Sequence, residues 1–286
     1  MIAGRVIGKF LTPSLALAAA AVVLLPTSRA MADQFVDLSD PGTTSGKIDA
    51  VVGGTALFTR VSNIPTGTGV FDPFLTIDNT PIEQGYNTSA DNLALPLDDL
   101  RNHWNHDVQL GQLATVTVGA DSYYVFDLDA NETGIGSDRK YLSIDNIRVY
   151  TSQTGGQTTS DLSQLGQLRF ALNDPNTPAT IMPNWVKIDA TIGLTSGSGS
   201  DDMLAYIPTK AFAGASDKDY VVFYNLNGVH YQADDGTSSD AGFEEWSALT
   251  GPSSSVPDGG NTLALMGSAL ATLGFVAGRR KMAISA

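Results

Sequence analysis

The chain has 286 residues, no cysteine, and a formal net charge of −14 at pH 7. The absence of cysteine excludes a disulfide framework, a thiolate metal site and a cysteine nucleophile. Residues 33–256 carry 10 basic and 29 acidic side chains, and such a surface repels nucleic acid and anionic lipid headgroups. We therefore expect no nucleic-acid partner.

The first 32 residues predict a secretory signal peptide. Arg5 and Lys9 give a positive start, and Leu15 to Leu25 is an uncharged apolar run that is short for a membrane span. Ala30 and Ala32 provide the small residues that signal peptidase needs, with cleavage expected after residue 32. An uncleaved N-terminal anchor is the alternative.

Alternating apolar and polar residues predict β-strands along the middle of the chain. Turn residues separate these runs every 8 to 12 residues or so, which is typical of an all-β, antiparallel, jelly-roll-like sandwich. Only residues 162–168 and 240–248 could hold a short helix. The clearest predicted strands are residues 114–118, 122–128, 141–150, 185–192 and 220–226.

Two loop regions bear on the organisation of this middle part. Asn227-Gly228 lies between two apolar-polar runs and predicts a hairpin over residues 221–232 with a type I′ turn. Residues 193–202 are rich in Gly and Ser and could be a domain linker. We interpret them as a long loop, because the flanking segments are too short to bury separate cores. The prediction is one acidic domain, residues 33–252.

The best candidate metal site is the acidic segment that begins at Asp127. Asp127, Asp129 and Asn131 present oxygen atoms at alternate positions, as a loop that binds Ca²⁺ does, and Asp138 falls at the last ligand position. The segment departs from an EF-hand-like loop because Glu132 replaces the turn glycine and no helix precedes it. The alternative is a strand end whose acids face solvent.

Other chemistry has weaker signals. His103 and His106 could share a helix face, but a zinc site needs further ligands, and His230 is the only other histidine. We expect a polar turn beside a packed Trp104 instead. No serine has the sequence context of a nucleophile elbow, and glycosidase carboxylates cannot be identified from sequence, since spatial separation defines them. We expect no catalytic residue.

Aromatic side chains could stack against sugar rings, although core packing is the alternative for each of them. The candidates are Trp104, Tyr123, Tyr124, Trp185 and Trp246.

The C-terminal segment, residues 253–286, has three parts in a fixed order. Val256, Pro257, Asp258, Gly259 and Gly260 follow a serine spacer. Residues 259–278 carry no charge, and we place a transmembrane helix at about 261–278. A basic cluster closes the segment and would hold that end in the cytoplasm; it consists of Arg279, Arg280 and Lys281.

This order of motif, apolar run and basic cluster resembles the PEP-CTERM class of sorting signals, in the variant whose motif is VPDGG. The resemblance implies that an exosortase, a membrane protease, recognises residues 256–260 and then releases the protein or attaches it to another carrier. It also implies a Gram-negative source that makes extracellular polysaccharide or a complex envelope. Residues 69–74, 83–88 and 242–246 look like segments of other proteins of this class. An ordinary C-terminal anchor is the alternative.

Together these observations predict a non-enzymatic surface or extracellular-matrix protein. It would be exported by the secretory pathway, processed by signal peptidase and an exosortase, and associated with extracellular polysaccharide. A Ca²⁺-assisted carbohydrate-binding module is the alternative, and a polysaccharide hydrolase is a third possibility.

Overall fold

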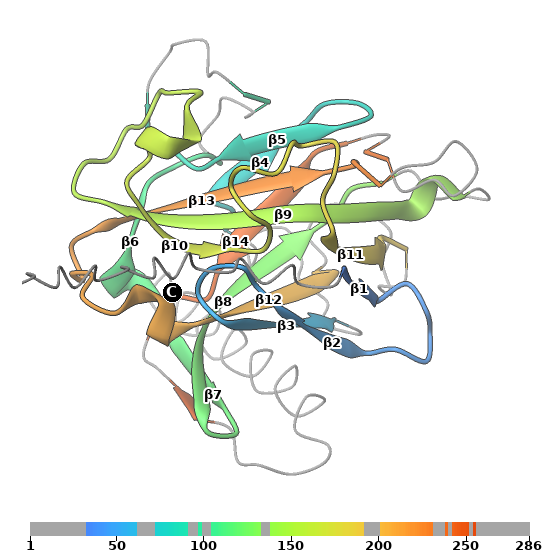
Figure 1. The fold of residues 1–286 in the computed structure, drawn as a ribbon, viewed down its shortest axis with the longest axis horizontal. Coiled ribbons are helices and arrows are strands. Elements are labelled where there is room, and N and C mark those ends of the chain that lie inside the picture. Colours follow the sequence, from blue (N-terminus) through green and yellow to red (C-terminus); the bar gives the residue numbers. More distant parts are fainter. Residues whose placement is uncertain are drawn as a thin grey trace, which may run out of the picture. The chain divides into compact units, whose positions relative to one another are not determined.

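The computed structural model describes residues 33–61, 72–90, 97–98, 104–132, 138–191, 201–230, 238–239, 242–251 and 254–255; for residues 138, 254 and 255 it describes the backbone alone. These residues form two β-sheets whose inner faces share one hydrophobic core (Figure 1). The expectation of a mostly β, antiparallel-rich fold is confirmed.

The first sheet, sheet A, is built around the long strand β9, Tyr141–Ser152. β9 lies between β11 and β13, and the path of the sheet is β1-β11-β9-β13-β5 (Figure 1). β1 runs parallel to β11, and β10 and β6 pair with β9 and β13. The other strands of sheet A are β1 (Gln34–Asp37), β5 (Glu83–Tyr86), β6 (Val108–Gln109), β10 (Gln167–Ala171), β11 (Asn184–Asp189) and β13 (Tyr220–Asn227).

The second sheet, sheet B, follows the path β15-β7-β8-β12-β3-β2, and β14 joins β8 to β4. β12 follows residues 192–200, yet it pairs with β8 and β3, so strands from both sides of that stretch share one sheet. The strands are β2 (Ser45–Asp49), β3 (Thr55–Arg60), β4 (Leu75–Ile77), β7 (Thr115–Val118), β8 (Asp121–Asp129), β12 (Met203–Pro208), β14 (Glu244–Ala248) and β15 (Ser254–Ser255).

Helical structure in the described residues is confined to short 3₁₀ turns. They are η1 (Leu110–Gln112), η2 (Asp138–Lys140), η3 (Leu162–Gln164) and η4 (Thr209–Phe212). No helix in the described part of the chain is long and apolar enough to cross a membrane.

The core between the sheets contains a group of aromatic rings. Phe223 of β13 lies 4.7 Å from Phe126 of β8 and 4.8 Å from Trp246 of β14, measured between ring centroids. Phe74 meets Phe223 edge to face at 5.7 Å. Because these rings come from both sheets and are almost fully buried, they join the two layers through apolar contact.

Two local predictions are wrong. The described part of residues 240–248 does not form a helix, because Glu244–Ala248 is strand β14 between β4 and β8. The hairpin at Asn227-Gly228 does not form either. β13 already has β9 on one edge and β5 on the other up to Asn227, so no edge is left for a returning strand. Gly228 instead bends the chain at φ +82° and donates its N–H to the Ser143 carbonyl.

Candidate functional site

Three aromatic rings stand in a row on the outer face of sheet A. Phe35 and Trp185 are register partners on β1 and β11, with ring centroids 4.2 Å apart. His230, which follows β13, stacks on Trp185 at 4.1 Å with an interplanar angle of 3°. Two rings cannot occupy the same place above one face, so Phe35 and His230 cover opposite faces of Trp185. We call these three residues the aromatic row.

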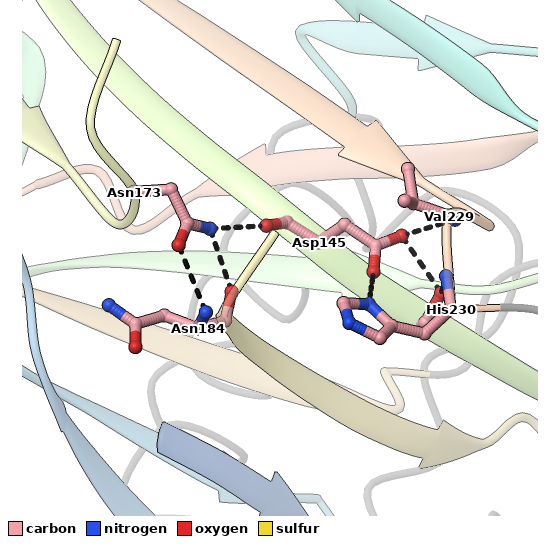
Figure 2. Close-up of polar contacts among 6 residues, drawn as sticks. Asp145, Asn173, Asn184, Val229 and His230 are labelled. Atoms are coloured by element: carbon pink, nitrogen blue, oxygen red, sulfur yellow. Dashed lines mark hydrogen bonds and ion pairs between the residues drawn. The ribbon is translucent and has the colours of Figure 1, made fainter. Parts of the chain in front are cut away.

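Asp145 of β9 fixes the orientation of the imidazole (Figure 2). Its Oδ1 lies 2.5 Å from His230 Nδ1, and its Oδ2 accepts hydrogen bonds from the Val229 N–H at 2.6 Å and the Ser143 hydroxyl at 2.8 Å. Burial raises the pKa of Asp145 above its ordinary value, and these three bonds act in the opposite direction. The carboxyl group is therefore buried but well supplied with donors.

The Asp145–His230 pair resembles two members of a hydrolytic triad, but the hydroxyl group beside it is placed differently. Ser143 donates to the Asp145 carboxylate and is fully buried, whereas a nucleophilic serine donates to the imidazole and faces the substrate. This arrangement positions the ring of His230, whose backbone N–H also contacts the Ser143 hydroxyl at 3.4 Å.

A pair of asparagines anchors the start of β11, and with it Trp185. Asn173 Nδ2 donates to the carbonyls of Asp145 and Asn184, each at 2.8 Å, and its Oδ1 accepts from the Asn184 N–H at 2.9 Å (Figure 2). Asn184 Oδ1 in turn accepts from the N–H of Gln34 in β1. These bonds hold β1, β9 and β11 together below the aromatic row.

Two of the four predicted metal ligands lie in a strand rather than in a loop. Asp127 and Asp129 lie inside strand β8, and Asn131 beyond it donates from Nδ2 to the Phe243 carbonyl at 2.8 Å. Asp138 begins η2, and its side chain lies outside the described residues, as does the backbone of residues 133–137. The structure therefore describes the side chains of three of the four predicted ligands, Asp127, Asp129 and Asn131.

Asp127 instead meets an acid from another strand connection. Its carboxyl contacts that of Asp201, which precedes β12, and burial together with the charge of Asp201 raises the pKa of Asp127 well above its ordinary value. Burial also raises the pKa of Asp201 to about 6. The described residues contain no cluster of three or more His, Cys, Asp or Glu side chains placed to hold a metal ion.

The five candidate sugar-stacking residues have different surroundings. Trp246 is fully buried and Tyr123 nearly so, which makes both of them core residues. Tyr124 packs edge to face against Phe212 at 5.0 Å, and Trp185 has a ring on each face. Trp104 is 38% exposed.

Several predicted residues lie outside the described part of the chain. These are His103, the cleavage residues Ala30 and Ala32, the motif Val256 to Gly260, and the basic cluster Arg279 to Lys281. His106 is half-buried, and its N–H donates to the Phe74 carbonyl. The predicted transmembrane helix also falls in this undescribed part.

Phe35, Ser143 and Asp145 are not among the candidate residues predicted from the sequence. Alternation along residues 141–150 places Ser143 and Asp145 on one face of a strand, but it cannot show that β11 and the end of β13 bring Trp185 and His230 to that face. Comparison of the chain with protein-family models and with curated protein sequences finds no match.

Proposed function

We propose that the chain is a non-enzymatic surface or extracellular-matrix protein that is exported, processed by an exosortase, and associated with extracellular polysaccharide. The observation that carries this proposal is the order of the C-terminal parts: the motif Val256 to Gly260, an uncharged run to Gly278, and the cluster Arg279 to Lys281. The acidic, cysteine-free, β-rich middle part is consistent with an exported domain. For its two sheets we propose a jelly-roll-like topology.

The aromatic row supports the contact with polysaccharide. Phe35 is 49% exposed on β1, which ends the path of sheet A. The half of Phe35 that does not face Trp185 offers an apolar surface to a sugar ring. Trp185 and His230 stiffen the row from behind, so little conformational freedom is lost on binding.

Two observations favour the proposed non-enzymatic role over a polysaccharide hydrolase. Glycosidase carboxyls stand about 5 to 9.5 Å apart on either side of the bond that they cleave. The carboxyls of Asp127 and Asp201 touch each other instead, and the Ser143 hydroxyl donates to the Asp145 carboxylate. Such contacts support cation or proton binding rather than glycoside hydrolysis.

A Ca²⁺-assisted carbohydrate-binding module is the second candidate. It is favoured by the Asp127–Asp201 pair, in which the Oδ1 atom of each residue is buried and accepts no hydrogen bond from the described residues. The proposed ligands from the sequence are Asp127, Asp129, Asn131 and Asp138, with Asp201 as an added neighbour.

Processing is tested in the native host with two variants. Replacing residues 257–260 with alanine should leave the chain as an unprocessed membrane precursor, while wild type appears as a shorter form outside the cell or on its surface. Leu270→Arg should weaken membrane retention with or without the exosortase, since a central charge costs about 2.5 to 3.5 kcal/mol on insertion. Equal processing of wild type and the alanine variant would show that the segment is a plain anchor.

Polysaccharide binding is tested with a glycan array on the full-length chain, with and without Ca²⁺. Phe35→Ala should lose binding, and Ile181→Ala should not, because Ile181 is also an exposed apolar residue but has no place in the aromatic row. Binding that survives Phe35→Ala would assign the contact to another surface, and binding that needs Ca²⁺ would favour the second candidate.

A further inference from the structure

A second pair of carboxyls lies between the two sheets, where β5 and β13 of sheet A meet β14 of sheet B. Alternation along a strand places Asn227 on the same face as Asn225, and Glu244 on the same face as Trp246. Asn225 Oδ1 accepts from Trp246 Nε1 at 2.9 Å across the core. Glu244 and Asn227 therefore point into the space between the sheets.

Direct contacts connect three fully buried side chains at this place. Asn227 and Glu83 are register partners on β13 and β5, and Asn227 Nδ2 donates to Glu83 Oε1 at 2.6 Å. The carboxyl of Glu83 also contacts that of Glu244 from the opposite sheet. Glu83, Asn227 and Glu244 are each 0% exposed, so bulk solvent does not reach them.

These side chains offer more acceptor atoms than they receive hydrogen bonds. Within the described residues, no N–H or hydroxyl donates to Oε1 or Oε2 of Glu244, or to Oε2 of Glu83. The amide oxygen of Asn227 also accepts no bond, although its Nδ2 fixes the amide against Glu83. Buried acceptors without donors cost free energy, so a group that supplies positive charge is needed here.

Burial and the neighbouring carboxyls also change the pKa values of Glu83 and Glu244. Burial raises the pKa of Glu83 to about 7, although hydrogen bonds from Asn227, the Asn79 backbone and Ser239 act in the opposite direction. Burial also raises the pKa of Glu244 well above its ordinary value. The carboxyls of Glu132 and Asp78 raise the pKa of Glu244 further. The pair must therefore bind either protons or a cation.

We propose that Glu83, Asn227 and Glu244 bind a divalent cation, with Ca²⁺ preferred, and that this ion joins the two sheets. All the available donors are oxygen atoms, and two carboxylates balance the charge of one divalent ion. Two carboxylates that can each bind through both oxygens, plus one amide oxygen, suit the large and flexible coordination of Ca²⁺ better than the strict octahedron of Mg²⁺. The proposal does not depend on export or polysaccharide binding, and it uses none of the residues of the acidic segment that begins at Asp127.

The first test measures binding by the full-length chain in mild detergent, after treatment with chelator. At a Ca²⁺ concentration a hundredfold above Kd, the melting temperature should rise by about 5 to 10 °C, because the folded state alone presents the site. Tb³⁺ should show luminescence excited through tryptophan, since Trp246 lies two residues from Glu244. If neither Ca²⁺ nor chelator changes the melting temperature and Tb³⁺ stays dark, the pair shares a proton alone and the proposal is wrong.

Variants then locate the ion. Glu244→Gln and, separately, Glu83→Gln should each lower Ca²⁺ affinity at least tenfold and abolish the melting response. Asp201→Asn is the matched control, because it neutralises the other carboxyl pair, and it should keep the response. A response that survives Glu244→Gln, or one that Asp201→Asn abolishes, would overturn the assignment.

Discussion

Two regions of the molecule each combine a tryptophan with a buried carboxyl group. The two regions differ in the number of hydrogen-bond donors that compensate the burial of that group. On the outer face of sheet A, Asp145 receives bonds from a backbone N–H, a hydroxyl and an imidazole. Between the sheets, Glu244 receives none from the described residues. Burial raises the pKa of both groups. A buried acid therefore indicates a ligand site only where its own chain leaves it without donors.

Substitution of the buried tryptophan, Trp246, should have the largest effect on the free energy of unfolding. Trp246→Ala removes a fully buried ring and leaves Asn225 Oδ1 without its donor, so we expect a loss of about 3 to 5 kcal/mol in the free energy of unfolding. Denaturant titration measures this loss as a lower midpoint at unchanged slope. A loss below about 1 kcal/mol would mean that the core around Phe223 refills the space.

The two carboxyls should respond in opposite ways to the same neutral substitution. Asp145→Asn turns an amide group toward the Val229 N–H and the His230 ring, and should cost about 1 to 3 kcal/mol. Glu244→Gln, measured in chelator, should cost nothing or stabilise, because its new amide donates to acceptors that have no donor. Chemical denaturation of both variants at pH 7.5 checks the contrast. Equal losses would remove the distinction between the two regions.

The outer tryptophan should contribute less than the inner one. Trp185→Ala removes the ring between Phe35 and His230, and we expect a loss of about 1 to 2 kcal/mol, because the row is partly open to solvent. The NMR signals of the His230 ring should shift at the same time, since the aromatic ring stacked on it is gone. A His230 ring whose signals do not move would show that Asp145 alone sets its orientation.

Substitution of an exposed acid should change the melting temperature least, and it serves as a reference for the two buried carboxyls. Asp161 is the N-cap residue just before η3, and the Ser163 hydroxyl, the Gln164 amide and the Ser163 N–H lower its pKa. Because the folded state lowers this pKa, the stabilisation is present at neutral pH and is lost as the pH falls below the ordinary value of 3.8. Asp161→Ala should therefore melt slightly below wild type at pH 6, and the gap should narrow in acid. Melting curves at both pH values test this, and a constant gap would contradict the charge-based explanation.

Local patterns predicted much of the β structure and little of the chemistry. Alternation predicted the strands that became β7, β8, β9, β11 and β13, because one face of each packs into the core. It did not identify strand β14, because residues 240–248 could also hold a short helix. The reason is that Glu244 is buried in a strand, a placement that its charge does not favour.

The candidate sites could not be predicted because they depend on distant pairings. Glu83 and Asn227 are 144 residues apart along the chain, and His230 meets Asp145 across 85. The sequence analysis grouped acids that are close in sequence, such as Asp127 and Asp129. In the structure Asp127 contacts Asp201 instead, an acid that is distant in sequence.

The pairing of β1 with β11 also determines when this protein can finish folding. The Gln34 N–H binds Asn184 Oδ1, 150 residues further along. A ribosome adds about 5 to 20 residues per second, so β1 waits about 8 to 30 s for its partner to be synthesised. During that time β1 exposes unpaired N–H and carbonyl groups, which can pair with other chains. We expect newly made chains to depend on a holding chaperone during that interval.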